Sequence, residues 1–139
     1  MITLQRAKRI GLIAVVGAWA MQPLQAHDDH GRVIRFPDLP DYQTLVSDLH
    51  QHTVFSDGNV WPTIRVEEGL RDGVDVMSVT EHLEYQPHRK DIPHPDRNRS
   101  FEIASKHAEG KDILVIPGAE VTRKMPPGHL NAVFIKDAN

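Results

Sequence analysis

The sequence predicts one small globular α/β domain built on a parallel sheet, and three observations support this prediction. Apolar stretches that suit buried strands alternate with helical segments, in the order strand, helix, strand, helix, strand. The composition is that of an ordinary globular protein, with 40% hydrophobic and 25% charged residues. The length of 139 residues is enough for one small domain and not for two.

The first 26 residues have the order of a secretory signal peptide. Three basic residues precede the uninterrupted apolar run Ile10–Met21, which is too short to span a bilayer, since that requires about 20 apolar residues. Cleavage after Ala26 leaves a better spacer than cleavage after Ala20, so we expect a mature chain that begins at His27. An uncleaved anchor is the alternative. We therefore expect an exported protein, periplasmic or secreted, with no stable membrane anchor after cleavage.

The mature chain is expected to comprise an extended lead-in over residues 27–43 and one domain over residues 44–139. The first strand, Leu45–His52, begins with apolar residues and ends in a histidine pair. A turn cluster separates it from the first helix, Pro62–Asp72. Proline suits the first helical turn, and Gly73 suits the stop that follows the helix.

The second half of the domain repeats this alternation. The loop Leu83–Asn98 is polar and rich in proline, and the second helix is expected to present Phe101, Ala104 and Ala108 on one face. The elements expected after the first helix are the strand Val74–Thr80, the helix Ser100–Glu109, the strand Ile113–Pro117 and a fourth strand, Leu130–Ile135.

Side chains that bind metals gather at the ends of these strands. Because the carboxyl ends of parallel strands meet at one rim of the sheet, residues far apart in the chain should meet there. His50 and His52 lie two residues apart, so in a strand they point to the same face. The residues at predicted strand ends are His50, His52, His82 and Glu120, with Asp57 in the turn after the first strand.

The residue types at this rim limit the chemistry. The chain has no cysteine, so a metal would be held by imidazole and carboxylate, which suit zinc, manganese or iron. A carboxylate can bridge two such ions, and a pair of ions is the usual clamp for displacement at phosphorus. Taken singly, His82 and Glu120 have structural alternatives, and Glu120 could pair with Arg123 on the surface. Asp48 and Glu81 either orient imidazoles or are solvated.

Four motifs resemble those of the PHP (polymerase and histidinol phosphatase) family. Residues 48–53 (DLHQHT) with Ser56-Asp57-Gly58 look like its first motif, and residues 79–82 (VTEH) resemble the second, although that family more often has Asp before the His. Residues 116–120 (IPGAE) resemble the third motif, and residues 128–130 (GHL) resemble the His-bearing motif that follows. The match in order and spacing runs from about Leu45 to Ile135.

This resemblance implies a metal-dependent phosphoesterase that uses a metal-bound hydroxide. It implies two or three divalent ions (Zn, Mn or Fe) in the complete domain and a small phosphate ester as substrate. It also implies catalytic roles for Glu120 and Asp57. The metal ligands that it implies are His50, His52, Asp57, His82, Glu120 and His129. The formal net charge of −3 gives no sign of a nucleic-acid partner.

The resemblance covers only the first part of the family's fold. PHP domains are distorted (β/α) barrels, and a complete barrel takes roughly 250 residues. The later motifs of the family, including an Asp-x-His, are absent, so we expect a truncated form or fragment that represents the N-terminal half of a barrel. Two alternatives to a phosphoesterase stay open at this point. One is a catalytically dead metal-binding module, and the other is an amidohydrolase-type metal hydrolase, which also begins with His-x-His.

Overall fold

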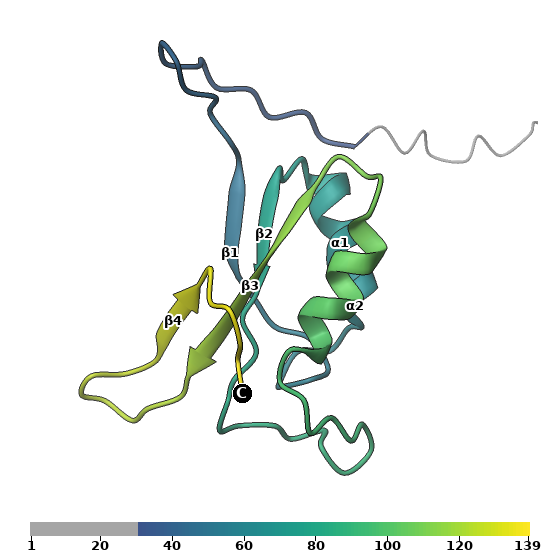
Figure 1. The fold of residues 1–139 in the computed structure, drawn as a ribbon, viewed down its shortest axis with the longest axis vertical. Coiled ribbons are helices and arrows are strands. Elements are labelled where there is room, and N and C mark those ends of the chain that lie inside the picture. The colour runs from purple at the N-terminus through teal and green to yellow at the C-terminus, as the bar shows by residue number, and fades with distance from the viewer. Residues whose placement is uncertain (1–30) are drawn as a thin grey trace, which may run out of the picture.

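A four-stranded sheet with two helices on one face makes up the part of the chain that the structure describes (Figure 1). The computed structural model describes residues 31–139. The expected signal peptide over residues 1–26 and the expected mature start at His27 lie outside the described residues. Among residues 31–139, none of the helices has the length and apolar character needed to cross a bilayer.

The sheet contains three parallel strands and one antiparallel strand, in the order β1-β2-β3-β4. The bounds are β1 Ser47–Gln51, β2 Val76–Val79, β3 Leu114–Val121 and β4 Leu130–Val133. Strands β1, β2 and β3 pair in parallel, as the alternation of strands and helices predicts, whereas β4 runs antiparallel to β3. The expected α/β class is therefore confirmed.

Helix α1 spans Pro62–Asp72, the range that the sequence predicts, and α2 spans Arg99–Ala108. Gly73 ends α1 in the left-handed conformation, with φ 75°, a geometry that glycine adopts without strain. Both helices lie on the same side of the sheet (Figure 1). The core that they form with the strands consists of Val66, Met77, Val79, Ala104, Ala108, Ile113 and Val115, with Leu70, Val74 and Phe101 packed against it.

Strand β3 is longer than the sequence predicts. The expected end at Pro117 is wrong, because β3 continues to Val121 and contains Glu120. Pro117 is the last residue of the β2–β3 ladder, and the β3–β4 ladder begins at Gly118. Pairing with β4 thus extends the strand past two residues that usually end strands. The antiparallel direction of β4 also places its first residues, and His129 before them, at the rim where β1 and β2 end.

Candidate metal centre

The six residues expected as metal ligands line one open hollow at the rim of the sheet. Its volume is about 370 Å³. The residues lining it are His50, His52, Asp57, His82, Glu120 and His129. They come from β1 and the turn after it, the segment that follows β2, β3, and the turn before β4. The structure therefore brings together every residue that the motifs single out.

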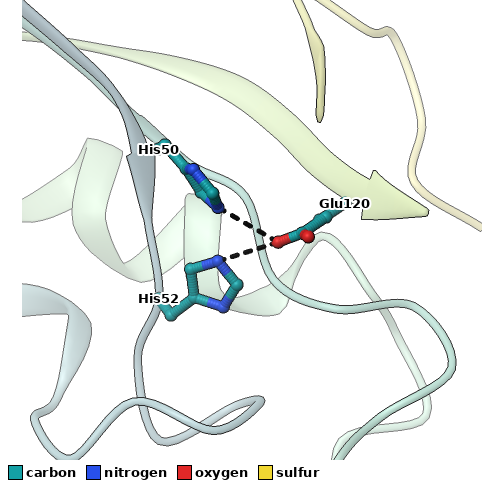
Figure 2. A group of neighbouring side chains, drawn as sticks. All are labelled: His50, His52 and Glu120. Atoms are coloured by element: carbon teal, nitrogen blue, oxygen red, sulfur yellow. Dashed lines mark hydrogen bonds and ion pairs between the residues drawn. The ribbon is translucent and has the colours of Figure 1, made fainter. Parts of the chain in front are cut away.

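Glu120 lies at the centre of this hollow. Its Oε2 atom lies 3.1 Å from His50 Nε2 and 2.9 Å from His52 Nε2 (Figure 2). The same oxygen lies 3.6 Å from His82 Nδ1, and Oε1 lies 2.5 Å from His129 Nδ1. The Glu120 side chain is only 1% exposed. A surface pairing with Arg123 is therefore excluded, and the carboxylate is surrounded by four imidazoles.

The backbone fixes the position of Glu120 within the sheet. His82 and Glu120 form a parallel bridge that continues the β2–β3 pairing beyond Val79. The N–H of Glu120 donates to the carbonyl of Glu81 at 2.9 Å, and the carbonyl of Glu120 accepts from the N–H of Leu83 at 3.0 Å. These bonds hold the ligands from β2 and β3 side by side.

An irregularity in β1 lies at the first histidine of the pair. Asp48 pairs with Met77 and Gln51 with Val79, so β1 uses one residue more than β2 over this stretch. Such a bulge bends a strand and changes where side chains point. Even so, both His50 and His52 reach the same oxygen of Glu120, as their spacing predicts.

Asp57 closes the other side of the hollow. Its Oδ1 lies 3.0 Å from His52 Nδ1, and its Oδ2 lies 3.4 Å from His82 Nε2. The turn that carries it folds back tightly on the residues that follow β1, because the N–H of Gly58 donates to the carbonyl of Thr53 at 2.9 Å. A Cβ atom on Gly58 would lie 2.5 Å from the carbonyl carbon of His52. Glycine is therefore required for this approach.

The electrostatics of the site favour an ionised Glu120. Burial raises the pKa of Glu120, but the hydrogen bond from His50 and the nearby His82, His52 and His50 outweigh that effect. The pKa of Glu120 therefore lies below its ordinary value. Among residues 31–139, its ion pairs are all with histidines and none is with Lys or Arg.

Three groups of side chains have ligand atoms close enough to hold an ion. Within each group, the ligand atoms lie within 4.8 Å of one another. The groups are His50 with His52 and Glu120, His52 with Asp57 and His82, and His82 with Glu120 and His129. Each pair of groups shares one residue, so the groups form a closed triangle. This donor set, imidazole and carboxylate without thiolate, fits zinc, manganese or iron.

Several contacts around the ligands are not evident in the sequence. Thr122 Oγ1 lies 2.8 Å from His82 Nδ1, and the N–H of Thr122 donates to Glu84 Oε2 at 2.7 Å. This backbone donor lowers the pKa of Glu84. Ser56 Oγ lies 3.3 Å from His52 Nδ1. The turn cluster containing Ser56 was the only sequence signal for these contacts.

Asp48 and Glu81 behave differently from each other. Asp48 accepts from the backbone N–H of His50 at 3.2 Å and from the side chain of Gln51, and neither contact involves an imidazole. Glu81 is buried and reaches His52 through Ser56. Only Glu81 therefore connects to a ligand side chain.

Solved structures resemble this chain in both sequence and fold. A two-domain protein from Bacteroides vulgatus that contains a predicted PHP-like metal-dependent phosphoesterase is 53% identical to it, with a TM-score of 0.75. The match covers 78% of this chain and 32% of that protein. The expected PHP resemblance is confirmed. The chain spans about a third of the length of this relative.

Two more distant structures were also found. An amidohydrolase from Chromobacterium violaceum, with bound sulfate and no metal, is 22% identical over 67% of this chain and 29% of its own, with a TM-score of 0.51. This likeness concerns the fold alone. A candidate metal-dependent phosphoesterase from Bifidobacterium adolescentis is 22% identical over 66% of this chain and 27% of its own, with a TM-score of 0.47, too low to support an inference. No protein-family model and no curated protein matches the chain.

Proposed function

We propose that this chain carries the metal-binding part of a phosphoesterase that hydrolyses small phosphate esters with the help of divalent ions. The observation that supports this most directly is the buried carboxylate of Glu120, which contacts four histidines from three segments of the chain. A carboxylate whose two oxygens face different imidazoles has the geometry of a bridging ligand. The resemblance to the PHP-like protein from Bacteroides vulgatus adds the class of substrate.

In this proposal, each residue has a definite task. His50 and His52 would hold one ion with Glu120, and His82 and His129 form a second group with the same carboxylate. Asp57 supplies the carboxylate of the remaining group and is half-exposed, at 41%, so it also faces incoming substrate. Bound divalent ions would supply Lewis-acid activation of water and neutralise charge on the phosphate. We propose zinc, manganese or iron, with two or three ions in a complete domain.

The openness of the hollow suits a substrate that enters from solvent. His50 and His129 have half of their side-chain surface exposed, at 54% and 51%, whereas His82 and Glu120 are buried at 6% and 1%. The ligands are thus anchored on the inner side and accessible on the outer side. A phosphate group could reach ions held here without displacing any element of the sheet.

The first test is metal binding by the purified protein. Wild type and the double variant His50→Ala plus His52→Ala should be loaded with Zn²⁺ or Mn²⁺ and analysed for bound metal. We expect the double variant to lose at least one ion per chain. His107→Ala is the matched control, because His107 pairs with Glu67 on the helical layer, away from the hollow. Equal metal content in all three proteins would refute the site.

The second test separates the reaction classes. The metal-loaded protein should be assayed with a chromogenic phosphodiester, a chromogenic phosphomonoester and a chromogenic amide. Phosphate-ester turnover that disappears in the double variant supports the proposal. Turnover of the amide alone would support an amidohydrolase, and bound metal without any turnover would support a binding module.

A further inference from the structure

Strand β4 places a further polar residue beside the hollow. Asn131 is the register partner of Glu120 in the antiparallel β3–β4 ladder, which lies at the end of β3 (Figure 1). Both backbone groups of Glu120 bond toward the other side of β3, because its N–H donates to Glu81 and its carbonyl accepts from Leu83. Glu120 and Asn131 therefore share no backbone hydrogen bond. In this type of antiparallel pair, the opposite residues come closest together.

This pairing fixes the face of the sheet on which Asn131 lies. Residues directly opposite each other in an antiparallel ladder share a face, and their Cβ atoms are about 4.5–5.5 Å apart. Glu120 faces the hollow, so Asn131 lies on that face as well. His129, two residues earlier, shares this face and contacts Glu120 Oε1 through its Nδ1 at 2.5 Å. Asn131 therefore borders the hollow on the side of β4.

The amide of Asn131 has no partner within the described chain. Among residues 31–139, its side chain makes no hydrogen bond, and the residue is exposed. Asparagine is depleted in β-strands, and its side chain competes for backbone hydrogen bonds. Neither packing nor an internal contact therefore explains an asparagine at this position.

The residues that line the hollow provide few groups for a bound phosphate. They are four histidines and two acids, and the proposed function assigns all six to cations. Phosphate oxygens that do not touch an ion would find no other donor among these six residues. The amide of Asn131 has two N–H donors and no charge. It can therefore bind a phosphate oxygen without repelling divalent ions held by Glu120.

We propose that Asn131 is a substrate-binding residue, whose side-chain N–H₂ group donates to an oxygen of the substrate phosphate on the β4 side of the ions. The inference rests on the proposed function, because it assumes that cations hold the phosphate in the hollow. It adds a residue that binds the phosphate directly and holds no ion. Loss of a hydrogen bond to a charged group usually weakens binding by about 10–100-fold.

The test measures metal binding and phosphate binding separately. The protein is loaded with Mn²⁺ and titrated with inorganic phosphate. Binding is followed by the ³¹P relaxation rate, which Mn²⁺ enhances only for phosphate close to it. Asn131→Ala removes the amide, and Asn131→Asp keeps its shape but replaces the N–H₂ donor with an acceptor. Leu130→Ala is the matched control, because Leu130 is also exposed, at 53%, and lies on the opposite face of β4.

The expected result is a loss of phosphate affinity without a loss of metal affinity. We expect Asn131→Ala to bind Mn²⁺ as wild type does and to bind inorganic phosphate about 10–100-fold more weakly. Asn131→Asp should bind phosphate at least as weakly as Asn131→Ala, because its carboxylate repels the phosphate. Leu130→Ala should match wild type in both measurements.

The outcomes separate this inference from the proposed function. If Asn131→Ala binds both Mn²⁺ and phosphate as wild type does, the inference is wrong and the metal site stands. If Asn131→Ala loses as much Mn²⁺ affinity as phosphate affinity, Asn131 supports the ligands, and the inference is again wrong. If wild type binds Mn²⁺ but no phosphate, the inference and the phosphate class of substrate fail together. If wild type binds no Mn²⁺, the proposed metal site fails, and the inference fails with it.

Discussion

Replacing Glu120 with glutamine is the most informative single change in this protein. Glutamine has nearly the same shape as glutamate, so Glu120→Gln removes the negative charge and leaves the packing of a side chain that is 1% exposed. The amide nitrogen cannot accept from histidine or bind a cation. Whichever way the amide is oriented, one of its two sides loses a ligand oxygen.

The size of the effect follows from the number of ligand groups that share this residue. Glu120 is a member of two of the three groups. Loss of a supporting contact alone usually costs 10–100-fold in metal affinity. If each of two ions loses at least this much, their combined occupancy falls by about 10²–10⁴-fold. Any turnover that needs both ions should fall by several orders of magnitude, because the activation of water depends on them.

The assay is isothermal titration with Zn²⁺ and Mn²⁺, combined with circular dichroism to confirm that the fold is retained. Glu84→Gln is the matched control. Glu84 lies two residues beyond His82 and accepts from the N–H of Thr122, a bond that the amide oxygen of glutamine can also accept. We expect a mild effect from the control. If Glu120→Gln bound both metals as wild type does, the bridging role would be refuted.

Three further predictions concern stability and processing. Removing metal with a chelator should lower the free energy of unfolding, measured in urea, by about 2.7 kcal/mol if the metal had been present at 100 times its Kd. An unchanged free energy of unfolding would show that no ion is bound. Gly58→Ala should destabilise the fold by about 1–3 kcal/mol and weaken metal binding, because the added Cβ would lie 2.5 Å from the backbone of His52. Gly110→Ala is the comparison variant: its Cβ would meet nothing within 4 Å, so any loss of stability there comes from the φ of +75° alone. N-terminal sequencing of exported protein should start at His27, or less favourably at Met21, and recovery of intact chains only from the cytoplasm would contradict export.

Local signals in the sequence were sufficient for most elements. Proline at the first turn and glycine after the last turn predict the bounds of α1 as they are observed, because both act within one helical turn. The alternation of strands and helices predicts the parallel pairing of β1, β2 and β3, because a helix between two strands provides the crossover connection that parallel strands need. Strand ends then predict that His50, His52, His82 and Glu120 meet at one rim, and the structure brings them together.

Tertiary structure alone decided the features that depend on partners far apart in the chain. β3 continues past Pro117 because β4 pairs with it, and the antiparallel direction of β4 explains how His129, which precedes a strand, joins residues that end strands. The hydrogen bond from Ser56 to Glu81 joins residues that are 25 positions apart in the chain. The contact between Thr122 and His82 joins residues that are 40 positions apart. Sequence identifies ligands by residue type and strand position, whereas the protonation and orientation of each imidazole depend on hydrogen bonds that only the folded chain forms.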